Sequence, residues 1–367
     1  MSNKRFEEID LIKALGIILI VAGHAGFPHS AFINFFHVSL FFIASGYVYK
    51  PDYASDIQTF LRFVWRKIRF LCFPYYLYNG ILSLFHNFWI RIGFYSLHSS
   101  VPEDAVSSLA LTDYWNTKDI TVNFLKGLIF RGDNELIQGI WFIKDLFILS
   151  VLYCFIDFLL YRLNRKHQYY QSFLAGVFLL LGFSLDRKGL IPYSLARILS
   201  CYSLYHLGTI LKENREILRF NRIFVRAAAV IVPIVLFGIL QWKEFSVSLV
   251  KNRYPDPLFL LLVSFSGWIL CYEVSRLIRK TGKLKEAFLS LGRNSYIVLL
   301  LHIISFKPVT LLKLSVNRSP LYYLSSIPTF QGEEKGWWML YLAFGILLPM
   351  LYSSIKDKVF KKNQKGI

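Results

Sequence analysis

Long apolar segments separated by short clusters of basic residues dominate this sequence and set the kind of fold it can adopt. The chain has 367 residues and is 55% hydrophobic, with a mean hydropathy of +0.44. A soluble domain cannot bury that much apolar surface, so the length is best interpreted as a number of membrane spans. We predict an all-α, polytopic membrane helical bundle of about ten transmembrane helices, forming one domain over residues 1–367.

The predicted spans follow the apolar segments. They cover residues 9–27, 33–49, 70–94, 139–161, 171–185, 191–211, 227–242, 257–274, 295–312 and 337–355. Residues 95–138 are more polar and too long for a simple turn. Within them, residues 124–130 are too short to cross a membrane, which favours an interfacial or re-entrant segment. We expect no fused extracytoplasmic domain.

The basic residues indicate the orientation of the chain. Its formal charge of +19 is spread over short clusters between apolar segments, which is typical of the positive-inside rule and argues against nucleic acid as a partner. With ten spans, the segments assigned to the cytoplasm hold 26 of the 42 Lys and Arg residues. The segments assigned to the outside hold no more than half as many, so both termini are predicted to be cytoplasmic.

The first predicted span carries an acid, a lysine and a histidine. Asp10 and Lys13 are three residues apart and can pair on one helix. Lys13 and His24 share a helix face about 16 Å apart along the axis. Ionisable groups inside a membrane usually face a bundle interior or a water-filled cavity, which indicates a functional site. The alternative is that Lys13 extends to the interface and His24 caps the far end of the span.

Two arginines precede the third predicted span. Arg66 and Arg69 are three residues apart, with Lys67 between them. Two guanidinium groups on one helical face can bind a diphosphate bidentately, which a single lysine cannot do. The competing interpretation is that these are ordinary basic residues flanking a membrane span.

Further residues inside predicted spans form a second group of site candidates. A histidine in an apolar span is often held by a neighbouring helix, and a serine beside a glycine favours close packing of backbones. Lys144 and Asp145 are adjacent and point about 100° apart on a helix, so we expect them to find different partners. The group comprises His37, Ser45, Trp141, Lys144, Asp145 and His302. No metal-ligand cluster is evident, and the four cysteines all lie in apolar segments.

These residues lie in motifs that resemble acyltransferase family 3 of integral membrane proteins, close to the fucose 4-O-acetylase-like sugar O-acetyltransferases. The first motif, R-F-E-E-I-D-L-I-K-A-L-G-I-I-L-I-V-A-G-H, supplies Lys13 and His24. The Arg-x-x-Arg pair is Arg66 and Arg69. The other motifs are F-F-H-V-S-L-F-F-I-A-S-G-Y (35–47), W-F-I-K-D-L-F (141–147) and G-R-N-S-Y-I-V-L-L-L-H (292–302).

The resemblance implies transfer of an acetyl (acyl) group from cytoplasmic acyl-CoA to a hydroxyl of a cell-surface or lipid-linked carbohydrate. It implies that His24 is the catalytic histidine and that Lys13, Arg66 and Arg69 bind acetyl-CoA. We include Asp10 with the catalytic candidates as the group that orients Lys13. A multi-pass protein of the bacterial inner (plasma) membrane is expected, in contact with membrane lipids and polysaccharide-assembly partner proteins.

The chemistry of acetyl transfer is consistent with these assignments. A sugar hydroxyl is a poor nucleophile, so it needs a base with a pKa near the working pH, and histidine is suited to this. His24 can act as a general base or carry the acetyl group itself, and the sequence leaves both open. A glycan transporter would also need many helices and buried charges, but no internal repeat is evident. A scaffold would need neither the stripe formed by Lys13 and His24 nor the arginine pair.

Overall fold

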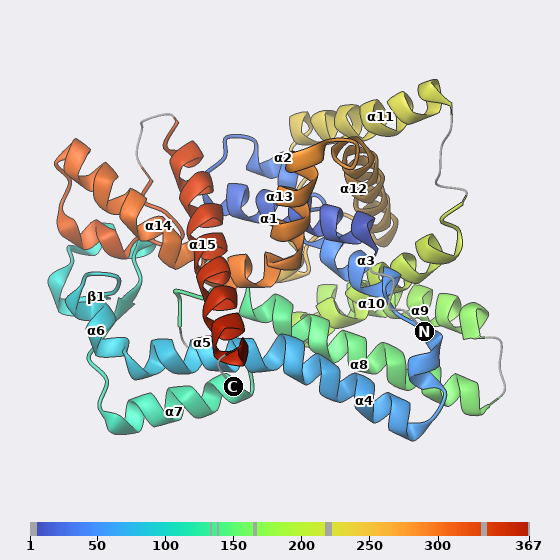
Figure 1. Cartoon of the computed structure of the whole chain (residues 1–367), viewed down its shortest axis with the longest axis horizontal. Helices are drawn as coiled ribbons and strands as arrows, with labels where there is room; N and C mark the ends of the chain where they lie inside the picture. The colour runs from blue at the N-terminus through green and yellow to red at the C-terminus, as the bar shows by residue number, and fades with distance from the viewer. Residues whose placement is uncertain are drawn as a thin grey trace. The chain divides into compact units, whose positions relative to one another are not determined.

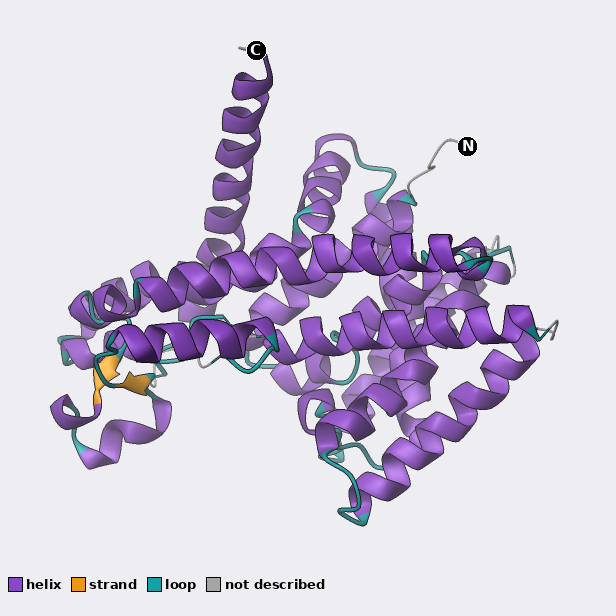
Figure 2. Ribbon diagram, turned by 90° about the horizontal axis from the view of Figure 1, so that it is seen from below, coloured by secondary structure: helices purple, strands orange, loops and turns teal. Residues whose placement is uncertain are grey.

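The computed structural model describes residues 6–132, 134–137, 139–163, 167–216, 222–331 and 336–365. Nearly all of its regular structure is helical, as predicted (Figures 1 and 2). The chain divides into two compact units that are each built from several segments. The first comprises residues 1–16, 31–72 and 141–293, and the second residues 17–30, 73–140 and 294–367. Helix α1 (Glu7–His24) contributes residues to both.

The first unit is built from long apolar helices, two short apolar helices and two short basic ones. Besides the beginning of α1, its α-helices are α2 (Ser30–Asn34), α3 (Ser39–Tyr47), α4 (Ile57–Lys67), α8 (Ile140–Arg162), α9 (His167–Arg187), α10 (Tyr193–Glu213), α11 (Ile223–Trp242), α12 (Pro257–Ile278) and α13 (Gly282–Arg293). A π-helical turn (Ile68–Cys72) and the 3₁₀ turns Pro51–Ala54 and Leu249–Lys251 complete it.

Helices α3 and α10 approach each other very closely within this unit. A Cβ atom added at Gly46 would lie 1.8 Å from the Tyr205 carbonyl oxygen, and one at Gly208 would lie 2.0 Å from that of Ile43. No side chain fits at either position, so the two glycines allow backbone-to-backbone packing. This agrees with the packing role predicted for the segment around Ser45.

The second unit combines two long helices with several short elements. Its elements are α5 (Phe73–Leu84), α6 (His86–Arg91), β1 (Ser96–Leu97), β2 (Leu111–Thr112), α7 (Thr117–Leu128), α14 (Ser295–Asn317), α15 (Trp337–Lys365) and the 3₁₀ turns His98–Ser100, Glu103–Ser108 and Leu321–Ser325. Strands β1 and β2 pair in parallel, with Ser96 opposite Leu111. Helix α14 packs along α15, and α5 packs along α7.

Helix α7 buries the polar Asn123 and exposes several apolar side chains. Asn123 is 3% exposed, whereas Leu125 is 56% exposed. The Asn123 side chain donates a hydrogen bond of 3.0 Å to Ser83 of α5. The exposed apolar side chains are consistent with the interfacial or re-entrant segment predicted here.

Within the described residues, five segments are long and apolar enough to cross a membrane: Ser30–Tyr47, Ile223–Trp242, Pro257–Ile278, Ser295–Asn317 and Trp337–Val359. Other long helices carry more polar or charged residues. Helix α1 carries Glu7, Glu8, Asp10 and Lys13, and α8 carries Lys144, Asp145 and Asp157. The number of ten spans and the cytoplasmic termini stay predictions.

Some element bounds differ from those expected. Residues 70–94, predicted as one span, contain part of the π-helical turn and then the separate helices α5 and α6. Pro74 stands second in α5, where its missing N–H is tolerated, and Gly93 has a positive φ of 80° just after α6. The predicted basic loops contain helices α4 and α13. An Asp56 capping box begins α4, with hydrogen bonds from the Gln58 and Thr59 amides.

Candidate active site

His24 and His302 form a direct pair in the second unit. His24 ends α1, and His302 lies near the middle of α14. The His24 Nδ1 atom lies 2.7 Å from His302 Nε2, and the two rings are nearly parallel, with centroids 5.0 Å apart. His302 is 0% exposed, whereas His24 is half-buried. His24 is therefore the member of the pair that can meet a substrate.

The hydrogen bonds of this pair define the positions of the protons when both rings are neutral. His302 Nδ1 lies 2.9 Å from the Leu299 carbonyl oxygen and 3.1 Å from that of Val298. Because a carbonyl only accepts, His302 Nδ1 carries a proton and donates it. His302 Nε2 then accepts the hydrogen bond from His24 Nδ1–H. His24 Nε2 is left with a lone pair, as a general base requires.

Asp10 holds two cations in the first unit. Its carboxylate lies 3.6 Å from the Lys13 ammonium nitrogen and 3.8 Å from Arg293 Nε. The pairing of Asp10 with Lys13 is thus present as predicted. Asp10 itself is 4% exposed, which suits a residue that positions Lys13 more than one that contacts a substrate.

Arg66 and Arg69 are both exposed side chains of the first unit. Arg66 donates a hydrogen bond of 3.0 Å to the Tyr53 hydroxyl, and its guanidinium lies 5.0 Å from the centre of that ring. The α-helix ends at Lys67, and Arg69 falls in the π-helical turn. The common α-helical face expected for the two arginines is therefore altered by this turn, a type of backbone feature that is frequent at functional sites.

Asp145 has its partner on another helix. It forms a buried ion pair with Arg197 of α10, and Arg197 also donates to the Val250 carbonyl oxygen. The Arg197 guanidinium lies 4.6 Å from the centre of the Trp141 ring. Two of the predicted candidates, Trp141 and Asp145, are thus brought together by Arg197, whose role the sequence did not indicate. Lys144 is half-buried beside them.

His37 and Ser45 lie in the first unit. His37 Nδ1 donates to the Ile33 carbonyl oxygen at 2.8 Å, across the turn between α2 and α3. Ser45 is half-buried on α3, next to the glycine that packs on α10. Both positions favour the structural interpretation.

Two lysines of α14 have structural roles that sequence reasoning missed. Lys307 is 1% exposed and donates to the carbonyl oxygens of Leu324 and Ser326 at 2.8 and 3.0 Å. Lys313 donates to the Phe330 carbonyl oxygen at 3.2 Å. The sequence feature that could have indicated a buried role is the position of Lys307 inside an apolar span, five residues after His302.

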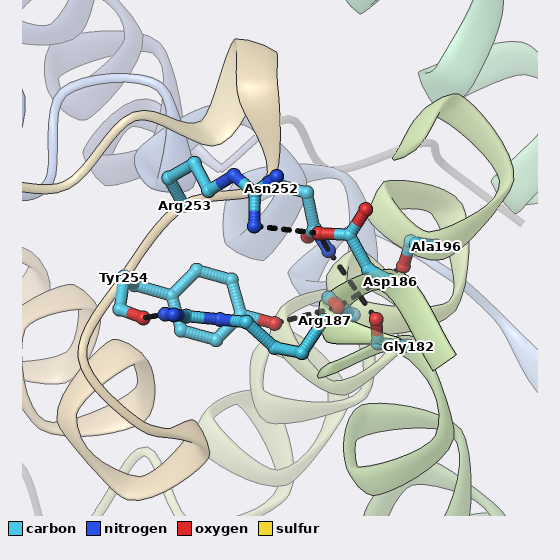
Figure 3. A network of polar contacts seen from close by, with 8 residues as sticks. Gly182, Asp186, Arg187, Ala196, Asn252, Arg253 and Tyr254 are labelled. Carbon is cyan, nitrogen blue, oxygen red and sulfur yellow. Dashed lines mark hydrogen bonds and ion pairs between the residues drawn. The ribbon is translucent and has the colours of Figure 1, made fainter. Parts of the chain in front are cut away.

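A polar network in the first unit joins the corner between α9 and α10 to the loop before α12 (Figure 3). The Asn252 amide donates to Asp186 and to the Gly182 carbonyl oxygen at 3.2 and 3.3 Å. Arg187 donates to the Tyr254 carbonyl oxygen at 2.6 Å, and the Tyr254 hydroxyl lies 2.7 Å from the Ser200 hydroxyl. These bonds fix a long connection and give no sign of a reactive group.

A second polar network, partly buried, lies where α8, α9 and α10 meet. The Tyr49 hydroxyl donates to Asp157 at 2.8 Å. His206 contacts the Tyr153 and Ser172 hydroxyls, each at 2.8 Å. Both ring nitrogens of His206 are thus engaged with hydroxyl groups, which is typical of a structural histidine.

Apolar helices that carry ionisable side chains define the general class of this protein. The fold and the histidine pair are those of a multi-span integral membrane protein with polar chemistry among its helices.

The comparison with known families gives the narrower identification. Residues 6–353 match the family model described as an acyltransferase domain. The chain therefore belongs to acyltransferase family 3, and the protein is a membrane acyltransferase. No curated protein and no solved structure matches it significantly.

Proposed function

We propose that this acyltransferase moves an acetyl group from cytoplasmic acetyl-CoA to a hydroxyl of a cell-surface or lipid-linked carbohydrate, with His24 as the base. The pair of His24 and His302 carries the proposal, since it leaves a lone pair on Nε2 of the half-buried His24. The resemblance of its motifs to the fucose 4-O-acetylase-like branch supports an acetyl donor and a sugar acceptor. A location in the bacterial inner membrane and partners in polysaccharide assembly belong to the same proposal.

The reaction follows from the protonation state of the pair. His24 Nε2 removes the proton of the acceptor hydroxyl while the hydroxyl oxygen attacks the thioester carbonyl carbon. The carbon–sulfur bond then breaks, and the imidazolium of His24 returns the proton to the departing thiolate. The hydrogen bond to His302 holds the His24 ring in the required tautomer throughout.

The basic residues of the first unit suit the donor. Coenzyme A carries a diphosphate and a 3′-phosphate, and Lys13, Arg66 and Arg69 supply cations for them. Asp10 positions Lys13 from 3.6 Å. Since both arginines are exposed, they are accessible to a ligand from the cytoplasm under the proposed orientation.

The test uses purified protein in liposomes with labelled acetyl-CoA and a carbohydrate acceptor. His24→Asn is expected to lower kcat by roughly 10²- to 10⁴-fold, the usual contribution of a general base. His302→Asn should lower kcat by roughly 10- to 100-fold, displace the acidic limb of the pH profile and leave the KM for acetyl-CoA unchanged. The exposed His29 provides the matched control, and His29→Asn should behave as wild type.

Full activity of His24→Asn would refute the base assignment. Failure of the wild type to consume any short acyl-CoA would refute the acetyl-CoA donor. Rapid gel filtration near neutral pH before acceptor is added separates the two catalytic routes, because labelled protein that forms in the wild type and not in His24→Asn would identify an acetyl-histidine intermediate.

A further inference from the structure

A polar cavity of about 300 Å³ lies in the second unit, lined by residues that no step of the proposed reaction uses. Its walls include His86, Tyr95, His98, Asp113, Trp115 and Glu135. We propose that this cavity binds one neutral sugar ring of the acceptor carbohydrate. The inference rests on the proposed function for the identity of the acceptor, and its test is independent of turnover.

The aromatic wall of the cavity is held in place. The rings of His86 and Trp115 stack with centroids 3.5 Å apart and an interplanar angle of 6°. The Asn87 side chain donates to the Trp115 carbonyl oxygen and accepts from its amide, both at 2.8 Å. Because Asn87 bonds both backbone polar groups of Trp115, the Trp115 ring is held in place. It is a preformed surface against which the apolar face of a sugar can pack.

His86 provides an acceptor without a partner. Its Nε2 lies 3.2 Å from the Asp113 carbonyl oxygen and 3.1 Å from the Thr112 hydroxyl. Because the carbonyl only accepts, Nε2 carries the proton of the neutral ring, and Nδ1 has the lone pair. Nδ1 is buried and has no hydrogen-bond partner among the described residues. Such an atom is costly to leave unpaired, and because less than 1 Å² of it is accessible, a ligand hydroxyl reaches it only if the His86 ring shifts.

The charged groups of the cavity favour a hydroxyl-rich ligand over an anion. Asp113 lies 3.3 Å from His98 Nδ1, and its side chain is 75% exposed. Desolvation raises the pKa of the second carboxyl group, Glu135, and the charge of Lys307 opposes that rise. Carboxylates accept strong hydrogen bonds from hydroxyl groups and repel phosphates. The volume is at the lower end for ligand pockets, which suits one ring.

Helix α14 connects this cavity to the histidine pair within the same unit. Lys307, whose charge acts on Glu135, follows His302 by five residues, or about 7.5 Å along the helix axis. The lysine also holds the Leu324 and Ser326 carbonyl oxygens. The adjacent Ser325 accepts a 2.9 Å hydrogen bond from Ser96 of β1. A ring bound here would therefore be held on the framework that carries His302.

The test measures binding to the purified full-length protein without acyl-CoA. Saturation-transfer difference NMR would be recorded with four probes: the methyl glycosides of glucose, galactose, fucose and N-acetylglucosamine. At least one is expected to bind, and Asp113→Asn combined with Glu135→Gln should weaken it about tenfold, as loss of charged hydrogen bonds does. Glu103→Gln, an exposed carboxylate of the same loop region that does not line the cavity, is the matched control.

Two results would overturn the inference: binding by none of the four glycosides, or equal binding by the wild type and the double variant. Specific binding without any acetyl transfer would refute the proposed function and leave the sugar site standing. Acetyl transfer to a sugar with binding insensitive to the double variant would refute this cavity alone. Thermal unfolding of each variant in detergent checks that the fold is intact.

Discussion

Single ionisable residues beside or within apolar helices set the chemistry of this acyltransferase. The bond to His302 places the lone pair of neutral His24 on Nε2, and Asp145 is neutralised by Arg197 of another helix. Burying a charge without such a partner would be strongly unfavourable. The environment of each residue therefore matters as much as its position in a motif.

Lys67, between the two arginines, is expected to make donor binding depend on pH. Burial lowers the pKa of Lys67 to about 8, and the charge of Arg66 adds to this effect. The side chain is thus cationic below about pH 8 and neutral above it, so it loses its attraction for phosphate as pH rises. The KM for acetyl-CoA should increase as the pH passes through about 8.

Steady-state kinetics from about pH 7 to pH 9 would measure this, with Lys67→Arg as the comparison. Arginine keeps its charge throughout this range, so the variant should show a flatter KM profile. The same rise in KM in Lys67→Arg would exclude Lys67 as the cause.

At the scale of elements, helices α5 and α7 show how polar side chains are accommodated where a short helix packs in apolar surroundings. Asn134 donates to Asn79 at 2.6 Å and to Ser83 at 3.1 Å, and Asn123 also contacts Ser83. These polar side chains bond to one another at the helix interface, where Asn134 Oδ1 has no hydrogen-bond partner among the described residues, while apolar side chains face outward. This arrangement is expected for a segment in contact with lipid, where unpaired polar groups are costly.

Gly127 of α7 allows this contact, so Gly127→Ala should destabilise the protein. A Cβ atom there would lie 2.0 Å from the Asn79 side-chain nitrogen. Overpacking of this kind costs about 1–3 kcal/mol of unfolding free energy. Unfolding by heat or denaturant in detergent would measure it, with Gly238→Ala of α11 as control, since nothing lies within 4 Å of a Cβ there. Equal stability of the two variants would contradict the prediction.

For the whole molecule, the distribution of basic residues predicts the arrangement across the membrane. The described cysteines Cys72, Cys154, Cys201 and Cys271 are all buried, so an introduced cysteine can be labelled selectively. A Glu103→Cys variant should react with an impermeant maleimide in intact cells. A Lys280→Cys variant should react only after permeabilisation. Labelling of Lys280→Cys from outside would contradict the predicted orientation.

The sequence by itself determined the helical membrane class and the motif residues Lys13, His24, Arg66 and Arg69. Apolar length, basic clusters and residue spacing are local properties of the chain, so they can be read without the fold. The bounds of most long helices followed from the same patterns. The π-helical turn Ile68–Cys72 and the break between α5 and α6 did not, because such local irregularities depend on their surroundings.

Only the tertiary structure decided which residues act together. His24 meets His302 across 278 residues of sequence, and Asp145 meets Arg197 on a different helix. The cavity around His86 and Glu135 is likewise assembled from separate segments. Partner choice depends on how helices and loops pack in space, and sequence spacing along one helix carries no information about that packing.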